Sequence, residues 1–386
     1  MKSSLFIKLF YLFQFFFDFI FIYAVEKLFY LSRGISLTQI GILLFFCSLM
    51  TLLLEVPTGI IADHWSRRKM LILSGLFYSV CYFILIFSNS FWLFLLGFLF
   101  RTLGGTFASG TLQAYVYDYL KINQKENDFE KIWGRGNAFR TLGIGVAVAF
   151  GGLISEISYV LVLIMSSISV LMVSFIAIIW PEVPMVTKTG EKNYWTFLKQ
   201  AITEVRSNQN LLRIVIFSGV VLSIFASLEE YNDVYLQFLG FPNSIIGLVF
   251  LMATIGQSIA SIIAEKFKKY SWTVLNFITI IGSVILFLAS VFKTPFMAIG
   301  ILLLGIFLEF SRVLNEGIIQ REVEPSKRAT IASLNSFLHN LIPFQLMIGI
   351  IANKNGLQSS YFILGILVLF YFVFLVLFKP KIRTAK

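Results

Sequence analysis

Long apolar runs alternate with short polar stretches along almost the whole chain. Each run holds about 20 residues or more, which is enough for an α-helix to cross the hydrocarbon core of a bilayer. We predict twelve membrane-spanning helices, at roughly 5–31, 36–62, 69–88, 91–120, 134–155, 158–180, 211–239, 243–264, 271–291, 295–321, 328–352 and 357–378. The pattern therefore predicts an all-α membrane protein with many spans.

The first apolar run is too long to be the apolar part of a cleavable signal peptide, and no small-residue cleavage site follows it. We therefore interpret it as a retained span. The composition agrees with a membrane protein, because 58% of the 386 residues are hydrophobic and only 13% are charged. A soluble domain of this length does not carry such a composition.

Two short sequences near the span ends occur in both parts of the chain. The loop after the second span reads "GIIADHWSRRK" and the loop after the eighth reads "SIIAEKFKK". Likewise "GISLTQIG" lies at the start of the second span and "GFPNSIIG" at the start of the eighth. We predict two pseudo-symmetric six-helix halves, 1–181 and 211–386. Internal repeats of this kind are common in secondary transporters.

A polar linker, 182–210, separates the two predicted halves. Its apolar residues fall on one face of a helix, and they are Tyr194, Trp195, Leu198, Ile202 and Val205. This spacing predicts a short amphipathic helix lying on the membrane surface.

The basic residues indicate the orientation in the membrane. Most of the 31 Lys and Arg lie at the N-terminus, in alternate loops, in the linker or in the tail, whereas Lys27, Arg33, Lys293 and Lys354 lie on the other side. Cytoplasmic loops are enriched in Lys and Arg. We predict a multi-pass protein of the cell membrane with both termini cytoplasmic. The net charge of +11 is then a topology signal with anionic-lipid contacts, and not a nucleic-acid surface.

Cysteines and histidines are too few for metal chemistry. Cys47 and Cys81 both lie in apolar runs, and His64 and His339 are far apart. No ligand spacing for a metal is present, nor a Gly-x-x-x-x-Gly-Lys-Ser/Thr sequence for binding ATP. We therefore expect no metal and no cofactor.

The stretch "EVPTGIIADHWSRRKML" places charges at the end of the second span. We expect Gly59 to let a neighbouring helix approach closely, and Asp63 to accept hydrogen bonds from Arg67 or Arg68. A charged contact of this kind holds one conformation and breaks in another, and we call it the latch. The alternative is that the basic cluster only anchors the loop on the cytoplasmic side.

This stretch resembles the loop motif of the major facilitator superfamily, Gly-x-x-x-Asp-basic-x-Gly-basic-basic. The resemblance to the superfamily covers essentially the full length, and within the superfamily the chain resembles bacterial drug exporters. The positions that match are Gly59, Asp63, Arg67 and Arg68. His64 and Ser66 depart from the motif. The resemblance implies that Asp118, near the cytoplasmic end of the fourth span, pairs with the motif, and that Glu265 marks its repeat in the second half.

Two further stretches resemble motifs of the same family. Arg101 and Gly105 in "FRTLGGTFA" match its fourth-span motif. The stretch "GIGVAVAFGG" in the fifth span keeps the glycines of a motif associated with antiporters, but it has Ala147-Val148 where Gly-Pro is usual. This departure weakens the inference of antiport.

Ionisable side chains inside a span cost several kcal/mol unless they face a cavity or a partner. Our candidates for proton coupling or for lining the cavity are Asp18, Glu26, Arg101, Glu229, Glu230, Asp233 and Glu309. They lie in the first, fourth, seventh and tenth spans, which the resemblance implies line a central cavity. Further candidates are Glu55, Arg312, Glu316 and His339.

Simpler interpretations exist for several of these residues. Glu26 precedes Lys27, and the two fit a solvated ion pair near the outer surface. Arg312 and Glu316 are four residues apart and fit an ion pair on one helix face. The acids of the seventh span are also explained as the solvated end of a helix. Glu55 is explained by a hydrogen bond to the next helix, and His339 by burial as a polar residue bonded to a neighbour.

Asp18 and Glu309 are the acids that these simpler interpretations explain least. Because burial in a span disfavours the charged form of a carboxyl group, we expect one of them to bind and release a proton, with Arg101 as its counter-charge. The excess of acids favours cationic substrates, and aromatic side chains in the spans offer cation–π faces. We predict a transporter, and not an enzyme, that works as a monomer by alternating access. It exports cationic or amphipathic small molecules by proton coupling, as in multidrug efflux.

Other functions fit the sequence less well. Proton-coupled uptake of a sugar, amino acid or peptide would use polar ligands such as Asn315, Asn335, Asn340 and Gln345. A membrane-embedded enzyme would need a nucleophile with a base or a metal cluster, and two isolated histidines argue against it. A channel or a transport-inactive sensor is disfavoured by the loop motif in both halves.

Overall fold

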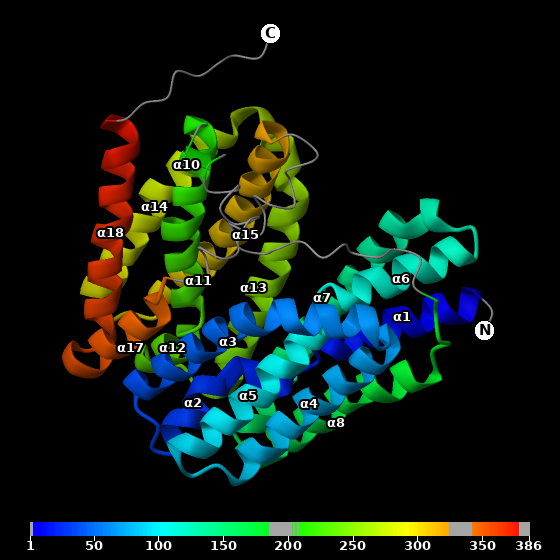
Figure 1. Ribbon diagram of the computed structural model, residues 1–386. Helices are drawn as coiled ribbons and strands as arrows, with labels where there is room; N and C mark the ends of the chain where they lie inside the picture. The colour runs from blue at the N-terminus through cyan, green and yellow to red at the C-terminus, as the bar shows by residue number, and fades with distance from the viewer. Residues whose placement is uncertain (1–2, 185–202, 204, 207, 324–341, 378–386) are drawn as a thin grey trace. The chain divides into compact units, whose positions relative to one another are not determined.

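The computed structural model describes residues 3–184, 203, 205–206, 208–323 and 342–377. These residues form helices joined by turns, and no strand occurs among them (Figure 1). Nine helical segments in this part of the chain are long and apolar enough to cross a membrane. The all-α class is as predicted, whereas the number of twelve spans stays a prediction.

The described chain forms two compact units. Unit 1 comprises residues 1–190 and 241–254, and unit 2 comprises residues 191–240 and 255–386. The predicted halves and the linker at 182–210 therefore stay a prediction. Most of the predicted amphipathic helix, including Tyr194 and Trp195, lies outside the described residues.

Unit 1 contains the helices of the first six spans. They are α1 (Ser3–Phe17), η1 (Phe21–Val25), α2 (Glu26–Ser32), α3 (Leu37–His64), α4 (Arg67–Phe87), α5 (Phe91–Ala108), α6 (Thr111–Ile122), η2 (Glu126–Asp128), α7 (Phe129–Ser155) and α8 (Tyr159–Ile179). α4 packs against both α5 and α8, and α7 packs along α1 and η1 (Figure 1).

Unit 2 contains the remaining described helices. They are α10 (Gln209–Phe217), the π-helical turn η3 (Ser218–Leu222), α11 (Ser223–Glu229), α12 (Asn232–Phe238), α13 (Asn243–Ala264, of which the first part belongs to unit 1), η4 (Glu265–Tyr270), α14 (Ser271–Val291), α15 (Met297–Glu322), α17 (Phe344–Asn355) and α18 (Leu357–Leu377). α14 packs against α15 and α18.

The first span is not one helix, although the sequence predicts a single run over 5–31. α1 ends at Phe17, and a 3₁₀ turn, η1, follows after Asp18–Ile20. Two serines of α8 replace the missing ladder bonds. Ser169 Oγ donates to the Phe19 carbonyl, and the Ile22 N–H donates to Ser166 Oγ at 3.2 Å. Non-helical backbone is tolerated at membrane depth only when such partners exist.

Glycines of α7 allow it to lie against this broken span. A Cβ on Gly143 would collide with the Phe15 carbonyl oxygen, and a Cβ on Gly151 would collide with that of Phe21. The glycine-rich stretch of the fifth span therefore has a packing reason. Small residues let membrane helices approach at the backbone.

The seventh span is broken as well. It passes through the π-helical turn η3, and α11 then ends at Glu229 before α12 begins at Asn232. Each of these broken spans is followed by a turn glycine in the left-handed region, Gly34 with φ +81° and Gly240 with φ +93°. The repeat seen in the sequence therefore corresponds to a repeated backbone shape, a broken span followed by a glycine turn.

Candidate functional site

The loop motif begins where α4 starts. Ser66 precedes α4, and its Oγ accepts a hydrogen bond from the Lys69 N–H at 3.2 Å, as N-capping serines do. Arg67 is then the first residue of the helix, and its Nη1 lies 2.5 Å from Asp118 Oδ2. Both side chains are buried, at 6% and 1% exposure. This is the pair that the family resemblance implies.

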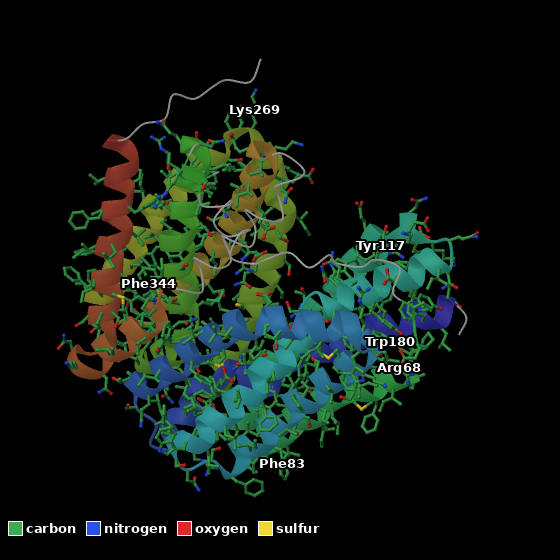
Figure 2. All side chains as sticks on the ribbon, viewed as in Figure 1. Arg68, Phe83, Tyr117, Trp180, Lys269 and Phe344 are labelled. Carbon is green, nitrogen blue, oxygen red and sulfur yellow. The ribbon has the colours of Figure 1, made fainter. Side chains whose placement is uncertain are left out.

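Arg68 binds a different partner. Its Nε donates to the Ala177 carbonyl at 3.2 Å, and its Nη2 donates to the Ile178 carbonyl at 2.6 Å. These carbonyls end α8, where helix oxygens lack internal partners. Figure 2 shows Arg68 beside Trp180, at the same end of unit 1. Arg68 therefore caps α8.

Ser66 and Arg68 also hold Glu182, which the sequence did not single out. Ser66 Oγ donates to Glu182 Oε2 at 3.0 Å, and Arg68 Nη1 lies 3.5 Å from Glu182 Oε1. Tyr115 Oη donates to the Pro181 carbonyl at 2.6 Å. The residues that follow α8 are thus tied to the loop motif, and Ser66, which departs from the family pattern, makes one of the ties.

The other expected members of the latch are Asp63, Gly59 and Glu265. The side chain of Asp63 lies outside the described residues. Gly59 is exposed on α3, and a Cβ there would meet no described atom within 4 Å, so the expected close helix contact stays a prediction. Glu265 is exposed at the start of η4. In unit 2, Arg321 donates to Ser271, the first residue of α14, at 3.2 Å.

The remaining lower-ranked candidates are Glu55 and His339. Glu55 is exposed and accepts a hydrogen bond from Ser109 Oγ at 3.3 Å, and Ser109 lies in the turn between α5 and α6 and not in the next helix. His339 lies outside the described residues.

Asp18 lies at the break of the first span and is paired with an arginine of α7. Arg140 Nε is 2.5 Å from Asp18 Oδ2. The guanidinium carbon of Arg140 also lies 5.0 Å from the centre of the Phe17 ring. The described ion-pair partner of Asp18 is therefore Arg140, whereas the predicted counter-charge, Arg101, pairs with Glu26.

Glu26 is buried at the start of α2, not solvated. Its Oε1 is 2.9 Å from Arg101 Nη1, and its Oε2 is 3.2 Å from Lys27 Nζ. Arg101 comes from α5 and lies over the ring of Tyr23, at 5.5 Å from the centroid. The pair joins the first and fourth spans.

The two ion pairs belong to one network. Tyr23 and Tyr78 each interact electrostatically with Arg101 and with Arg140. Gly104 and Gly105, in the fourth-span stretch, make room for Tyr78. A Cβ on Gly104 would lie 2.8 Å from the Tyr78 ring, and a Cβ on Gly105 would lie 3.1 Å from its hydroxyl.

Unit 2 holds an acid with a neutral partner. Gln257 Nε2 on α13 donates to Glu229 Oε1 on α11 at 2.6 Å. Gly305 on α15 packs directly against this pair, since a Cβ there would lie 3.1 Å from Gln257 Nε2 and 3.4 Å from Glu229 Oε1. Three helices therefore meet at this carboxylate–amide pair.

α15 carries further charges on the same face as Gly305. Glu309, Arg312 and Glu316 follow it at helical spacing. Arg312 Nη1 is 3.1 Å from Glu309 Oε2, so it pairs with the preceding acid and not with Glu316. Glu309 and Arg312 also act electrostatically on Glu229.

The seventh-span acids after Glu229 lie at the second break. Glu230 is partly exposed, whereas Asp233 is 1% exposed and accepts a hydrogen bond from the Val234 N–H at 2.9 Å. Asp233 is therefore buried, and it does not lie at a solvated helix end. Among the described residues, no group of three or more His, Cys, Asp or Glu is placed to hold a metal ion.

Three residues of the site were missed by sequence reasoning. Arg140 lies inside the predicted fifth span, so the same cost argument that selected Arg101 would have found it. Gln257 carries no charge, and a lone amide in a span gives no comparable signal. Glu182 lies in a loop, where acids are ordinary.

A helical bundle with broken spans and embedded ion pairs is typical of secondary transporters. The sequence model of the Major Facilitator Superfamily matches residues 9–344. The chain belongs to this superfamily, so it is a transporter and not an enzyme.

Known proteins resemble the chain over nearly its whole length. A Bacillus subtilis (strain 168) protein, described as the uncharacterized MFS-type transporter YxaM, is 22% identical over 371 residues, which cover 92% of this chain and 91% of that protein. The crystal structure of the nucleoside transporter NupG matches with a TM-score of 0.80 at 16% identity, covering 99% of this chain and 100% of that one.

A second solved structure is a bacterial homolog of the human lysosomal transporter Spinster, in an inward-facing and occupied conformation. It matches with a TM-score of 0.74 at 16% identity, over 97% of this chain and 95% of that one. At these identities the likeness shows the fold, and it confirms the fold class predicted from the sequence.

Proposed function

We propose that the chain is a proton-coupled exporter of cationic or amphipathic small molecules, and that Glu229 carries the proton. The observation that carries this proposal is the neutral partner of Glu229. Asp18 and Glu26 each bind an arginine, whereas the described partner of the Glu229 carboxylate is the amide of Gln257.

A carboxyl group beside an amide can change its protonation state without losing its partner. Gln257 Nε2 donates to one oxygen of Glu229, and a protonated carboxyl still accepts there through its carbonyl oxygen. Protonation of Asp18 would instead remove the charge that Arg140 binds. We therefore favour Glu229 over Asp18 and Glu309, which the sequence had favoured.

The charge balance of the seventh and tenth spans supports a cationic substrate. Arg312 is the cation among the acids of this region of unit 2, which are Glu229, Glu230, Asp233, Glu309 and Glu316. Carboxylates inside a membrane protein attract cationic groups, because hydrocarbon offers them no other counter-charge.

Alternating access would use the latch. The Arg67–Asp118 pair ties the start of α4 to α6, and its buried geometry suits a contact that breaks in another conformation. We place both termini in the cytoplasm and the protein in the cell membrane, as the distribution of Lys and Arg supports. One chain carries all of these groups, so we propose a functional monomer.

The test is transport by purified protein in proteoliposomes with an imposed pH gradient and a panel of fluorescent organic cations. Wild type should accumulate at least one cation against its gradient, and Glu229→Gln should abolish the response to the pH gradient. Glu126→Gln, an exposed acid near η2, is the matched control and should transport as wild type does. Gradient-driven transport that survives in Glu229→Gln would exclude Glu229 as the proton carrier.

Uptake of a polar solute is a second candidate. The fold likeness to NupG, a nucleoside transporter, supports it. The amide of Gln257 beside Glu229 also suits a solute rich in hydroxyl and amide groups. Counterflow of radiolabelled uridine in the same proteoliposomes, with no transport of any cation, would favour this candidate over export.

A further inference from the structure

We propose that unit 1 carries a subsite for a carboxylate group of the transported solute, formed by Arg140 and Arg101. The inference rests on the chain being a transporter and names a second chemical feature of its substrate. It does not depend on Glu229 carrying the proton.

Arg140 has donors that the described structure does not use. A guanidinium group has five N–H donors. Within the described residues, Arg140 donates one hydrogen bond, from Nε to Asp18 at 2.5 Å. Its side chain is 42% exposed and its flat face lies over the Phe17 ring. The two Nη groups therefore remain available in a fixed orientation.

Arg101, on α5, is in a similar state. Its Nη1 donates to Glu26 at 2.9 Å, and its side chain is 22% exposed. The rings of Tyr23 and Phe98 flank the guanidinium at 5.5 and 5.7 Å. Ion pairing and aromatic contacts thus hold each arginine, and neither uses up its donors within the described residues.

Two tyrosines connect the arginines. Tyr23 and Tyr78 both interact electrostatically with Arg101 and with Arg140, and both are partly exposed. Their hydroxyls can donate to the same group that the arginines bind. The four side chains come from η1, α4, α5 and α7, so the arrangement is built by tertiary packing and not by one helix.

The unused donors of the two arginines select an anion. A guanidinium group has donors and no acceptor, so only an acceptor group can use the remaining N–H groups of Arg140 and Arg101. A carboxylate is an anion whose two oxygens match the N–H fork of a guanidinium.

The substrate class that follows is a solute with a carboxylate group. The arginines of unit 1 suit this group, whereas a plain organic cation offers their N–H donors no anionic acceptor.

The test compares three probes that share an indole ring: tryptamine, tryptophan and indole-3-propionate. Binding to purified full-length protein is measured by thermal stabilisation in detergent over a concentration series. Tryptophan and indole-3-propionate should bind wild type more tightly than tryptamine. Arg140→Gln should weaken binding of both carboxylates by about tenfold or more and change tryptamine by less than about twofold.

Matched variants separate recognition from structure. Arg135→Gln removes an exposed arginine of the same helix and should leave all three affinities unchanged. Because Arg140→Gln leaves Asp18 without its partner, the double variant Asp18→Asn with Arg140→Gln and the variant Arg140→Lys are measured too. The double variant should lose the carboxylate preference, and the lysine should retain part of it.

Either of two results would overturn the subsite. One is that the carboxylates bind wild type no better than tryptamine, or that no indole binds. The other is that Arg140→Gln weakens tryptamine as much as it weakens the carboxylates. If the carboxylates bind no better than tryptamine but tryptamine is transported, the subsite fails and the proposed export of cations stands. If carboxylate binding depends on Arg140 but no transport is driven by the proton gradient, the subsite stands and only the proposed proton coupling is refuted.

Discussion

Arg67 and Arg68 are neighbours in the sequence, yet they bind different partners. Arg67 enters a buried ion pair with Asp118, and Arg68 caps α8 at the carbonyls of Ala177 and Ile178. A buried pair is a weak source of net stability, but removing one partner leaves an uncompensated charge. The two arginines should therefore respond differently to substitution.

Asp118→Asn should destabilise the protein by about 3–5 kcal/mol, because Arg67 would stay buried after losing its ion pair with Asp118. The measurement is the free energy of unfolding by SDS in mixed micelles. The double variant Arg67→Gln with Asp118→Asn should be more stable than the sum of the single losses by about 1–3 kcal/mol.

Lys69→Gln serves as the control for this pair. Lys69 is exposed on the same turn of α4, and its substitution should change the unfolding free energy by less than about 0.5 kcal/mol. A loss in Asp118→Asn no larger than that of Lys69→Gln would mean that the pair has little energetic effect.

At the scale of single residues, the sequence identified the charged site residues more reliably than it identified their ion-pair partners. The loop motif pointed to Arg67 and Asp118, and the structure brings them together. The partners of Asp18 and Arg312 were not foreseen, since pairing depends on which helix faces which, and that information lies in the packing. An embedded charge is visible in a sequence, whereas its counter-charge is not.

α7 acts as a continuous support for the broken first span. Asn137 bonds Gln14 at 3.4 Å, Arg140 pairs with Asp18, and two glycines meet the backbone on both sides of the break. These residues recur at helical spacing, so they lie on one face of α7. The element is therefore specialised along its length for one neighbour.

Gly151→Ala should destabilise the protein by about 1–3 kcal/mol, because the new Cβ would collide with the Phe21 carbonyl oxygen. The measurement is again SDS unfolding. Gly134→Ala, in the same helix, meets no described atom within 4 Å and should be neutral or stabilising by up to about 1 kcal/mol. Equal effects of the two substitutions would contradict this account of the glycine-rich stretch.

The α8 serines that support the break of the first span make a second prediction at this scale. Ser166→Ala and Ser169→Ala should each cost about 1–3 kcal/mol, because the Ile22 N–H or the Phe19 carbonyl would lose its partner. Hydrogen–deuterium exchange of the peptide covering residues 18–25 should become faster in both variants.

Ser290→Ala is the control for the serines, since Ser290 is half-buried and its hydroxyl donates within its own helix, to the Phe287 carbonyl at 2.6 Å. It should leave both the unfolding free energy and the exchange rate unchanged. Exchange at residues 18–25 that is as slow in the α8 variants as in wild type would show that the break does not depend on these serines.

The apolar runs located the elements but not their interruptions. Residues 5–31 contain neither glycine nor proline, so no local signal marks the break after Phe17. The interruption is a tertiary effect, set by serines of α8 and glycines of α7. Propensity and periodicity report on single helices and cannot see such partners.

For the whole molecule, the distribution of Lys and Arg predicts which loops face the cytoplasm. Lys268 in η4 and Lys354 at the end of α17 are both exposed and lie in loops of opposite predicted sides. With Cys47 and Cys81 replaced by alanine, Lys354→Cys should react with a membrane-impermeant maleimide added to intact cells. Lys268→Cys should react only after the membrane is permeabilised.

The reversed labelling pattern would place both termini outside, and labelling of both sites in intact cells would contradict the predicted number of crossings between them. Transport activity of each variant in proteoliposomes checks that the substitutions leave the fold intact.

At the scale of the whole molecule, the fold class and the superfamily could be predicted from the sequence. Composition and apolar runs led to an all-α membrane protein, and the loop motif led to the superfamily that the comparisons show. The substrate did not follow, because it depends on a few side chains whose partners only the fold assigns.

The paired glycine turns at Gly34 and Gly240 bear on the ancestry of the chain. A duplicated gene would account for two halves that share a broken first span and a left-handed turn after it. The charges around those breaks differ, with arginine-bound acids in one copy and an amide-bound acid in the other. After such a duplication, the joints of the backbone would have been kept while the ionic groups diverged. When relatives of this protein are aligned, the turn glycines are therefore a better guide to the register of the repeat than the charged residues.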